Sequence, residues 1–294
     1  MILLAVDSEM RSDHALPVVA ALALAGSQQV LALHVSEGVW LPADPAERPA
    51  RRLAEFGVDA RWDTLVTPDR DVSGAILRRA RVEGASLIAL GSHGRTSLGG
   101  VLVGSVSHRV LAGADCQVLI VPGSGAAGPT FPAEISRILV AVDLSAESAS
   151  ALAAVERLAP RLGARVLITH VSDAYQAYRD GSYLQALEAA RDRVRQAVQR
   201  LRTLGVRAEW TIPAALWSVP QRIAGVADEW QADLLVVGCR RHPELASVLV
   251  GSVTHRLIHL TTRPMLVAER PARPARVGAR QMSELRLAVK LGES

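Results

Sequence analysis

Short apolar runs alternate along the chain with longer patterns of helical period. The runs at residues 2–6 and 138–142 are β-favouring, and each leads into an aspartate, Asp7 or Asp143. A serine follows closely, Ser8 or Ser145, and then an Ala- and Leu-rich stretch with helical spacing. This order predicts a strand, a turn and a helix capped by the serine, and it predicts them twice.

The duplication continues through four more strands in each half of the chain. Asp7 and Asp143 are separated by 136 residues. The second apolar run ends at residue 35 in the first copy and at residue 171 in the second, which is the same separation of 136 residues. After that point the second copy is longer, and residues 183–203 predict a full helix where the first copy has only a short Pro-rich excursion. The predicted strands after the first are residues 30–35, 58–66, 87–90 and 118–121, and residues 166–171, 206–212, 234–237 and 265–268.

Strands that alternate with helices favour a parallel, doubly wound α/β sheet with ligands at the carboxyl ends of its strands. We therefore expect two tandem Rossmann-like domains, each with a five-stranded parallel sheet. Their expected bounds are 1–122 and 136–269, with a Gly-, Ser- and Pro-containing linker at 123–135 and a basic tail at 270–294.

Composition agrees with this fold and excludes several functions. The 294 residues are 49% hydrophobic but only 3% aromatic, which suits helix-covered parallel sheets built from Ala, Val and Leu. The net charge of +4 comes with a basic tail and with arginines spread along helical patterns beside acidic residues. Because no basic stripe interleaved with aromatics is present, we expect no nucleic-acid partner.

Rare residue types narrow the chemistry further. Lys290 is the only lysine, so no Walker A loop can be completed. Cys116 and Cys239 lack the number and spacing of a disulfide framework or a zinc site, and they favour a reducing cytoplasm. The chain opens without a secretory pattern and has no apolar run of membrane-spanning length, so we expect no membrane association.

Two glycine segments, residues 91–109 and 238–256, are nearly the same sequence. Each follows a predicted strand and precedes a predicted helix, where backbone amides can hold a phosphate. In the first copy Gly91, Gly94 and Gly104 would allow close approach, while Ser105 could cap the helix and offer a hydroxyl. Asp7 would face the same crevice and could accept hydrogen bonds from ribose hydroxyls.

The spacing Gly-x2-Gly-x9-Gly-Ser, with an Asp closing the first strand, resembles the ATP-binding branch of the universal stress protein family. The resemblance covers both copies and implies a fold like that of the adenine nucleotide alpha hydrolases, with domains that pair through their last strands, here as an intramolecular pseudo-dimer. It implies that the Asp contacts ribose, the second-strand Val contacts the base and the glycine loop holds the phosphates. The matched positions of the first copy are Ala5, Asp7, Val35, Gly91, Gly94, Gly104, Ser105 and Val106.

The second copy departs from this pattern at one position, where Arg241 stands in place of Gly94. A side chain there would crowd the phosphate or require a backbone that costs non-glycine residues about 1 kcal/mol or more. The arginine could instead swing outward or contact a phosphate itself. We favour a weakened or empty second site, whose matched positions are Asp143, Val171, Gly238, Gly251, Ser252 and Val253.

The expected function is therefore binding of ATP, with Mg²⁺, in the first copy, coupled to stress response through conformation or unidentified protein partners. No residue stands out to activate an attacking water, so we expect no catalytic residue, and slow ATP hydrolysis stays an alternative. Two functions compete with ATP binding, namely a nucleotide-independent scaffold and an adenylyl-transferring enzyme, although this chain lacks the signatures of the second. A homodimer of the tandem chain is a further option.

Histidines raise one more question. His255 and His259 are four residues apart on a predicted helix, a spacing that can chelate zinc. Because no acidic or Cys partner is adjacent and His108 of the first copy lacks such a companion, we expect helix-surface histidines and no metal. His34 and His170 end the second strands, where we expect them to be hydrogen-bonded structural residues.

Overall fold

The computed structural model describes residues 1–8, 13–38, 44–92, 104–123, 133–143, 146–173, 183–215, 218–238 and 252–268. The first repeat contains β1 (Ile2–Val6), a 3-10 turn η1 (Asp13–Ala15), α1 (Leu16–Gly26), β2 (Val30–Ser36), α2 (Glu47–Glu55), β3 (Ala60–Val66), α3 (Val72–Val82), β4 (Leu87–Ser92), α4 (Ser105–Gly113) and β5 (Gln117–Pro122).

The second repeat has the same order with a longer middle helix. It contains β6 (Arg137–Ala141), α5 (Ala146–Leu162), β7 (Arg165–Thr169), β8 (Ser172–Asp173), α7 (Tyr183–Thr203), β9 (Ala208–Thr211), β10 (Ala214–Ala215), α8 (Val219–Glu229), β11 (Leu234–Gly238), α9 (Ser252–Leu260) and β12 (Met265–Ala268). The short strands β8 and β10 pair with each other in a small separate sheet that the sequence did not predict.

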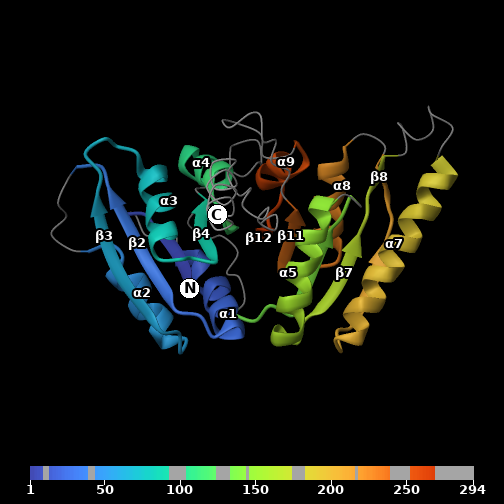
Figure 1. Ribbon diagram of the computed structural model, residues 1–294, viewed down its shortest axis with the longest axis horizontal. Coiled ribbons are helices and arrows are strands. Elements are labelled where there is room, and N and C mark those ends of the chain that lie inside the picture. The colour runs from blue at the N-terminus through green and yellow to red at the C-terminus, as the bar shows by residue number, and fades with distance from the viewer. Residues whose placement is uncertain are drawn as a thin grey trace, which may run out of the picture.

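The other strands form one continuous ten-stranded sheet in the order β3-β2-β1-β4-β5-β12-β11-β6-β7-β9. Within each half, all neighbouring strands run parallel, which confirms the two five-stranded, doubly wound units. The halves meet where β5 pairs antiparallel with β12, with Leu119 opposite Leu266. The expected pairing through the last strands thus joins the two repeats of a single chain side by side (Figure 1).

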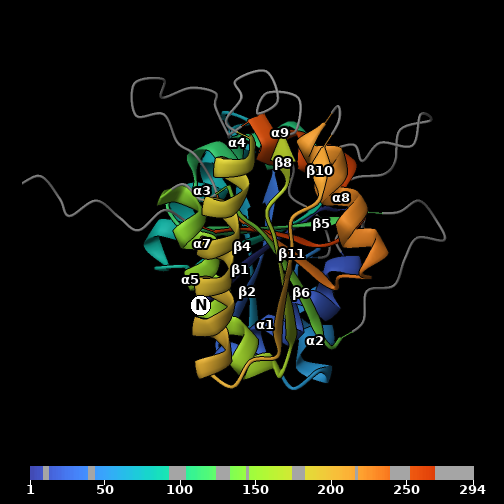
Figure 2. The same ribbon diagram turned by 90° about the vertical axis from the view of Figure 1, so that its right-hand side faces the viewer.

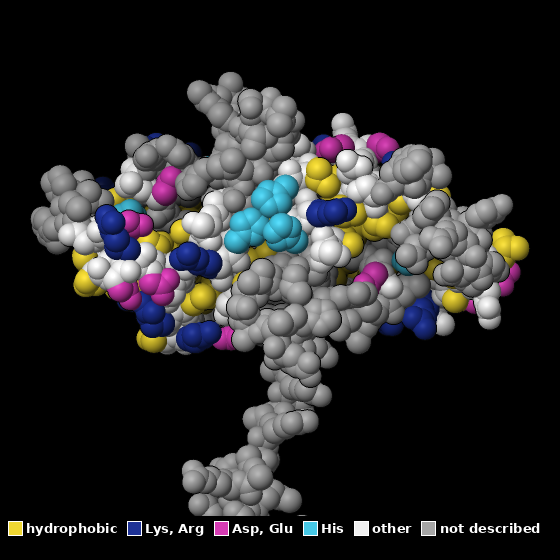
Figure 3. Space-filling model, turned by 90° about the horizontal axis from the view of Figure 1, so that it is seen from above, with side chains coloured by type: hydrophobic (Ala, Val, Ile, Leu, Met, Phe, Trp, Pro, Cys, Tyr) yellow, Lys and Arg dark blue, Asp and Glu magenta, His cyan; other side chains and the backbone are white. Residues whose placement is uncertain are grey.

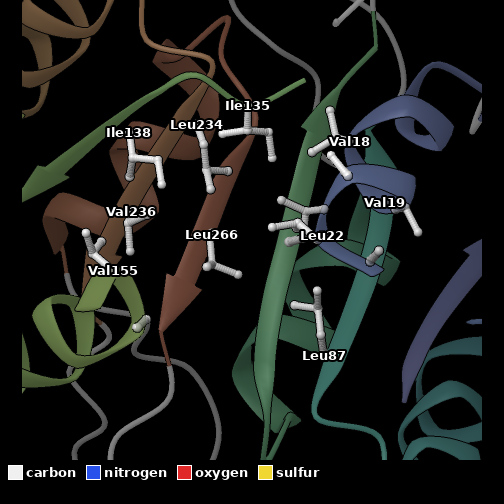
Figure 4. Packing of buried hydrophobic residues seen from close by; sticks show 14 of the residues in the cluster. Val18, Val19, Leu22, Leu87, Ile135, Ile138, Val155, Leu234, Val236 and Leu266 are labelled. Atoms are coloured by element: carbon white, nitrogen blue, oxygen red, sulfur yellow. The ribbon is translucent and has the colours of Figure 1, made fainter. Parts of the chain in front are cut away.

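Helices cover both faces of this sheet, and each face has a buried cluster that runs across the seam between the repeats. One cluster holds side chains of α1, α2, α5 and α7, and the other holds side chains of α3, α4, α8 and α9. Figure 2 shows α7 and α8 on opposite sides of the second repeat's strands. Figure 4 shows part of the first cluster at the seam, with Val18 and Leu22 of the first repeat on one side and Ile135 and Leu266 on the other.

Helix positions were predicted less well than strands. Residues 183–203 form the expected helix, but the expectation of only a Pro-rich excursion in the first copy is wrong, because α2 forms there. Pro49 lies in the first turn of α2, where a missing N–H costs no intrahelical hydrogen bond. The expected cap by Ser8 is also wrong, since α1 begins at Leu16 after η1 and its cap position is Ala15. Ser145 lies outside the described residues.

In the parts of the chain described above, no helix is both long and apolar enough to cross a lipid bilayer.

Candidate functional site

A cavity of about 420 Å³ opens at the carboxyl ends of β1, β2 and β4 in the first repeat. The strand order changes direction at β1, because β2 pairs on one of its sides and β4 on the other. Open α/β sheets bind ligands in the crevice at such a switch point. The volume lies within the roughly 300–1,000 Å³ range of small-molecule sites.

Apolar and polar side chains both line this first cavity, and the polar residues His34, Ser36 and Ser107 are buried. Its residues are Ala5, Val6, Asp7, Ser8, Leu33, His34, Val35, Ser36, Glu37, Val72, Ile76, Leu90, Gly91, Val106 and Ser107. Val35 and Ile76 are nearly fully buried and belong to the core cluster on that face. Such a mixed surface suits a flat ring with polar groups on its edge, such as a nucleobase.

His34 holds the end of β2 against the end of β1. Its Nδ1 lies 3.1 Å from the carbonyl oxygen of Val6, so the ring donates a hydrogen bond from Nδ1. His170 makes the equivalent contact with Val142 in the second repeat, at 3.0 Å. Both histidines are therefore structural, as expected, and His34 fixes the backbone next to Asp7.

The N-terminus of α4 carries backbone amides next to the first cavity. Gly104 occupies the cap position in an extended conformation, and within the described part of the chain this helix start has no side-chain cap hydrogen bond. The expected capping role of Ser105 is wrong, because Ser105 is the first residue of the helix itself. An uncapped helix N-terminus presents donors and a partial positive charge, which together favour an anion.

A second cavity lies at the equivalent place in the second repeat. It has a volume of about 270 Å³, and Asp143, Val171, Gly238, Ser252 and Val253 are among its lining residues. This volume is below the usual range for small-molecule sites. The two repeats thus offer equivalent but unequal crevices.

Internal hydrogen bonds occupy polar groups of the second cavity. The Ser148 hydroxyl donates to the Asp143 carboxylate, and the Asp143 amide donates to Ser148 Oγ at 2.8 Å. Thr254 Oγ1 donates to the carbonyl oxygen of Gly238 at 3.0 Å. A ligand hydroxyl would have to compete with Ser148 for Asp143.

The structure therefore brings together most of the residues that the sequence singled out. Ala5, Asp7, Val35, Gly91 and Val106 line the first cavity, while Gly104 and Ser105 lie just outside its lining at the start of α4. Gly94, Gly251 and Arg241 lie outside the described residues.

The fold also assembles a group that sequence reasoning missed. His108, His255 and His259 come together on α4 and α9, although the sequence places them in different repeats. The missed signal was the near-identity of the two glycine segments, which makes His108 and His255 equivalent positions.

Comparisons with known proteins agree with the fold and the repeat. The family model described as the universal stress protein family matches residues 1–122 and again residues 134–269. A universal stress protein of Mycobacterium tuberculosis H37Rv is 29% identical over 192 residues. The match covers 63% of this chain and 62% of that protein, so it spans less than two thirds of the relative's length.

Solved structures extend the comparison to nearly the whole chain. A universal stress protein from Archaeoglobus fulgidus DSM 4304 superposes with a TM-score of 0.70 at 21% identity, covering 92% of this chain and 98% of its own. A shorter universal stress protein from Archaeoglobus fulgidus, solved in complex with dAMP, matches 46% of this chain and 98% of its own at 23% identity, with a TM-score of 0.37. The tandem family match, together with the duplicated sheet, shows that the chain belongs to the universal stress protein family.

Proposed function

We propose that the chain binds ATP with Mg²⁺ in the first cavity and acts in the stress response as a nucleotide-dependent regulator or sensor in the cytoplasm. The observation that carries the proposal is the convergence of Asp7, Val35, Gly91 and Val106 around one cavity at the switch point of the sheet, beside the uncapped N-terminus of α4.

Each part of the cavity has a chemical role in this proposal. The Asp7 carboxylate accepts hydrogen bonds from the ribose hydroxyls, and Val35 packs against the adenine ring. The amides that begin α4, near Gly104, donate to phosphate oxygens, for which the partial positive charge of the helix end is favourable. Mg²⁺ offsets the remaining charge of the triphosphate. The proposal is one of binding rather than turnover, with occupancy transmitted to protein partners.

The second repeat is proposed as a partner domain with a weakened or empty site. Its smaller cavity supports this assignment, in addition to the arginine at position 241. We retain 1–122 and 136–269 as the proposed domain bounds, with a linker at 123–135 and a basic tail at 270–294.

Replacing Asp7 with asparagine tests the proposed site. The substitution keeps the size of the side chain but removes a charged acceptor, and hydrogen bonds to charged groups contribute about 1.5–3 kcal/mol. We expect the dissociation constant for ATP, measured by calorimetry with Mg²⁺, to rise roughly 10- to 100-fold.

Asp143→Asn in the second repeat is the matched control and should leave the ATP dissociation constant unchanged. If wild type and D7N bind ATP with the same dissociation constant, Asp7 does not contribute to the site. An absence of ATP binding by the wild type would instead favour a nucleotide-independent scaffold.

Exchanging the glycine and arginine of the two repeats tests the proposed asymmetry. Gly94→Arg should weaken ATP binding to the first repeat by roughly fivefold or more, because we expect its side chain to crowd the phosphates or to require a backbone that costs non-glycine residues about 1 kcal/mol or more. Arg241→Gly should raise the stoichiometry toward two nucleotides per chain. Titration with ATP measures both the affinity and the number of nucleotides per chain. If neither changes in either variant, the role proposed for this pair of equivalent positions is contradicted.

A further inference from the structure

Three histidine rings gather where the two repeats meet. His108 lies on α4, and His255 and His259 lie one turn apart on α9. The ring centroids are 5.0 Å apart for His108 and His255, 5.1 Å for His108 and His259, and 5.4 Å for His255 and His259. Figure 3, which views the molecule from above relative to Figure 1, shows the histidines as a compact patch near the centre of the visible surface.

The meeting of these side chains follows from the duplication. Antiparallel pairing of β5 with β12 brings the preceding helices, α4 and α9, to either side of the seam on the same face of the sheet (Figure 1). His108 and His255 occupy the same position in the two glycine segments. A local two-fold relation between repeats brings such equivalent residues together at the axis, as in a symmetric dimer.

The third histidine breaks this symmetry. The first repeat has the exposed residue Ala112 where the second has His259. The cluster thus combines a symmetric pair from both repeats with a His-x3-His pair on one helix, a spacing known to place two imidazoles on a single metal ion. Only the folded tandem chain brings the third ligand to this pair.

The distances are close to those of a metal site. One ring nitrogen from each histidine can be chosen so that all three lie within 4.8 Å of one another. Tetrahedral zinc with bonds of 2.0–2.1 Å needs nitrogens roughly 3.3–3.4 Å apart. Closing the widest gap takes a shift of about 1.5 Å or less, within the reach of small χ1 and χ2 changes of partly exposed side chains.

We propose that His108, His255 and His259 form a binding site for a divalent transition-metal ion, best matched by Zn²⁺, that joins the two repeats. Three imidazoles suit zinc, copper and nickel rather than magnesium or calcium, which prefer oxygen ligands. Three protein ligands leave the fourth position of a tetrahedral ion for water or another small ligand.

The pKa shifts of His108 and His255 agree with this role, because the ligand form of histidine is the neutral ring. Partial burial, followed by the neighbouring histidines, lowers the pKa of His108. Partial burial and His259 also lower the pKa of His255. The lowered pKa values of these two residues favour the neutral ring that a metal ion requires.

The metal site also lies on a helix shared with the proposed nucleotide site. The amide of His108 donates to the carbonyl of Gly104, so His108 is one turn from the helix end that faces the first cavity. A bound ion would hold α4 against α9. The metal site can be tested with no nucleotide present, so its outcome is separate from that of the proposed function.

Titration of the purified full chain with Zn²⁺ tests the proposal. We expect one ion per chain, and a rise in Tm on the order of 5 °C at saturating Zn²⁺. Co²⁺ should give the visible absorption of a tetrahedral site. His108→Ala leaves the His255 and His259 pair intact, yet should weaken Zn²⁺ binding roughly 100-fold or more, since losing even an indirect partner of a metal ligand costs about 10- to 100-fold.

Two further variants make the result specific. Ala112→His places a fourth imidazole at the position equivalent to His259. We expect it to tighten Zn²⁺ binding and to displace the water or small ligand from the fourth position of the ion. The absorption spectrum of bound Co²⁺ would show this change of ligand. His14→Gln is the control, because His14 lies elsewhere, bonded through Nε2 to the Val121 carbonyl, and its loss should change nothing in the titration. Wild-type protein that binds no Zn²⁺, or H108A that binds as tightly as wild type, would overturn the proposal.

Discussion

Replacing Gly104 with glutamate should weaken ATP binding by roughly 100-fold or more, because it sets a negative charge against the phosphates and displaces amide contacts that contribute about 1.5–3 kcal/mol each. Gly104 adopts φ −69°, which any residue can take. A carboxylate at a helix N-terminus also stabilises the helix. The variant is therefore expected to stay folded, and calorimetry with ATP and Mg²⁺ measures the loss.

The equivalent change in the second repeat is the control for this result. Gly251→Glu introduces the same charge at the same motif position and should leave ATP binding at the wild-type level, since the proposed site is in the first repeat. Equal losses in the two variants would place nucleotide in both crevices. If G104E has an unchanged circular dichroism spectrum and binds ATP as tightly as the wild type, the N-terminus of α4 does not bind the phosphates.

Replacing Leu119 with alanine should lower the free energy of unfolding by about 2–5 kcal/mol, the usual cost of removing a large buried aliphatic side chain. Leu119 is fully buried in β5 and faces Leu266 of β12 across the seam. Because the core clusters on both faces run through both repeats, the repeats should unfold together in one transition at a lower denaturant midpoint.

Leu184→Ala is the matched control, because Leu184 is 73% exposed on α7. A surface substitution of this kind should change the free energy of unfolding by no more than about 0.5 kcal/mol. Two separate unfolding transitions in wild type, or a loss in L119A no larger than that in L184A, would contradict the account of the seam as a shared core. Urea unfolding followed by circular dichroism gives both values.

The strands and their succession along the chain were predictable because the two copies carry the same apolar runs at nearly constant separation. Met265–Ala268 was predicted to the residue, since a strand that is buried on both faces of a sheet has a continuous apolar sequence. The start of α1 was not, because α1 begins without a side-chain cap, while Ser8 looked like one. Short helices such as α2 also depend on tertiary packing, here through buried Ala50 and Leu53, rather than on a local signal.

Residues of the first cavity were predictable for a similar reason. Asp7, Val35 and Gly91 follow or end strands whose carboxyl ends meet at one edge of a parallel sheet, so their convergence follows from the order of the elements. The histidine cluster was missed because it depends on contact between repeats. The sequence of its own helix places no second histidine near His108. The antiparallel pairing of β5 and β12 instead brings α9, with His255, next to it.

A crystal structure of the protein grown with ATP and Mg²⁺ tests the central claim most directly. We expect density for one nucleotide per chain, in the cavity between β1, β2 and β4, with the ribose within hydrogen-bond distance of Asp7 and the phosphates at the N-terminus of α4. The crevice of the second repeat should hold none. Nucleotide density in the second crevice, or an empty first cavity at saturating ATP, would contradict the account.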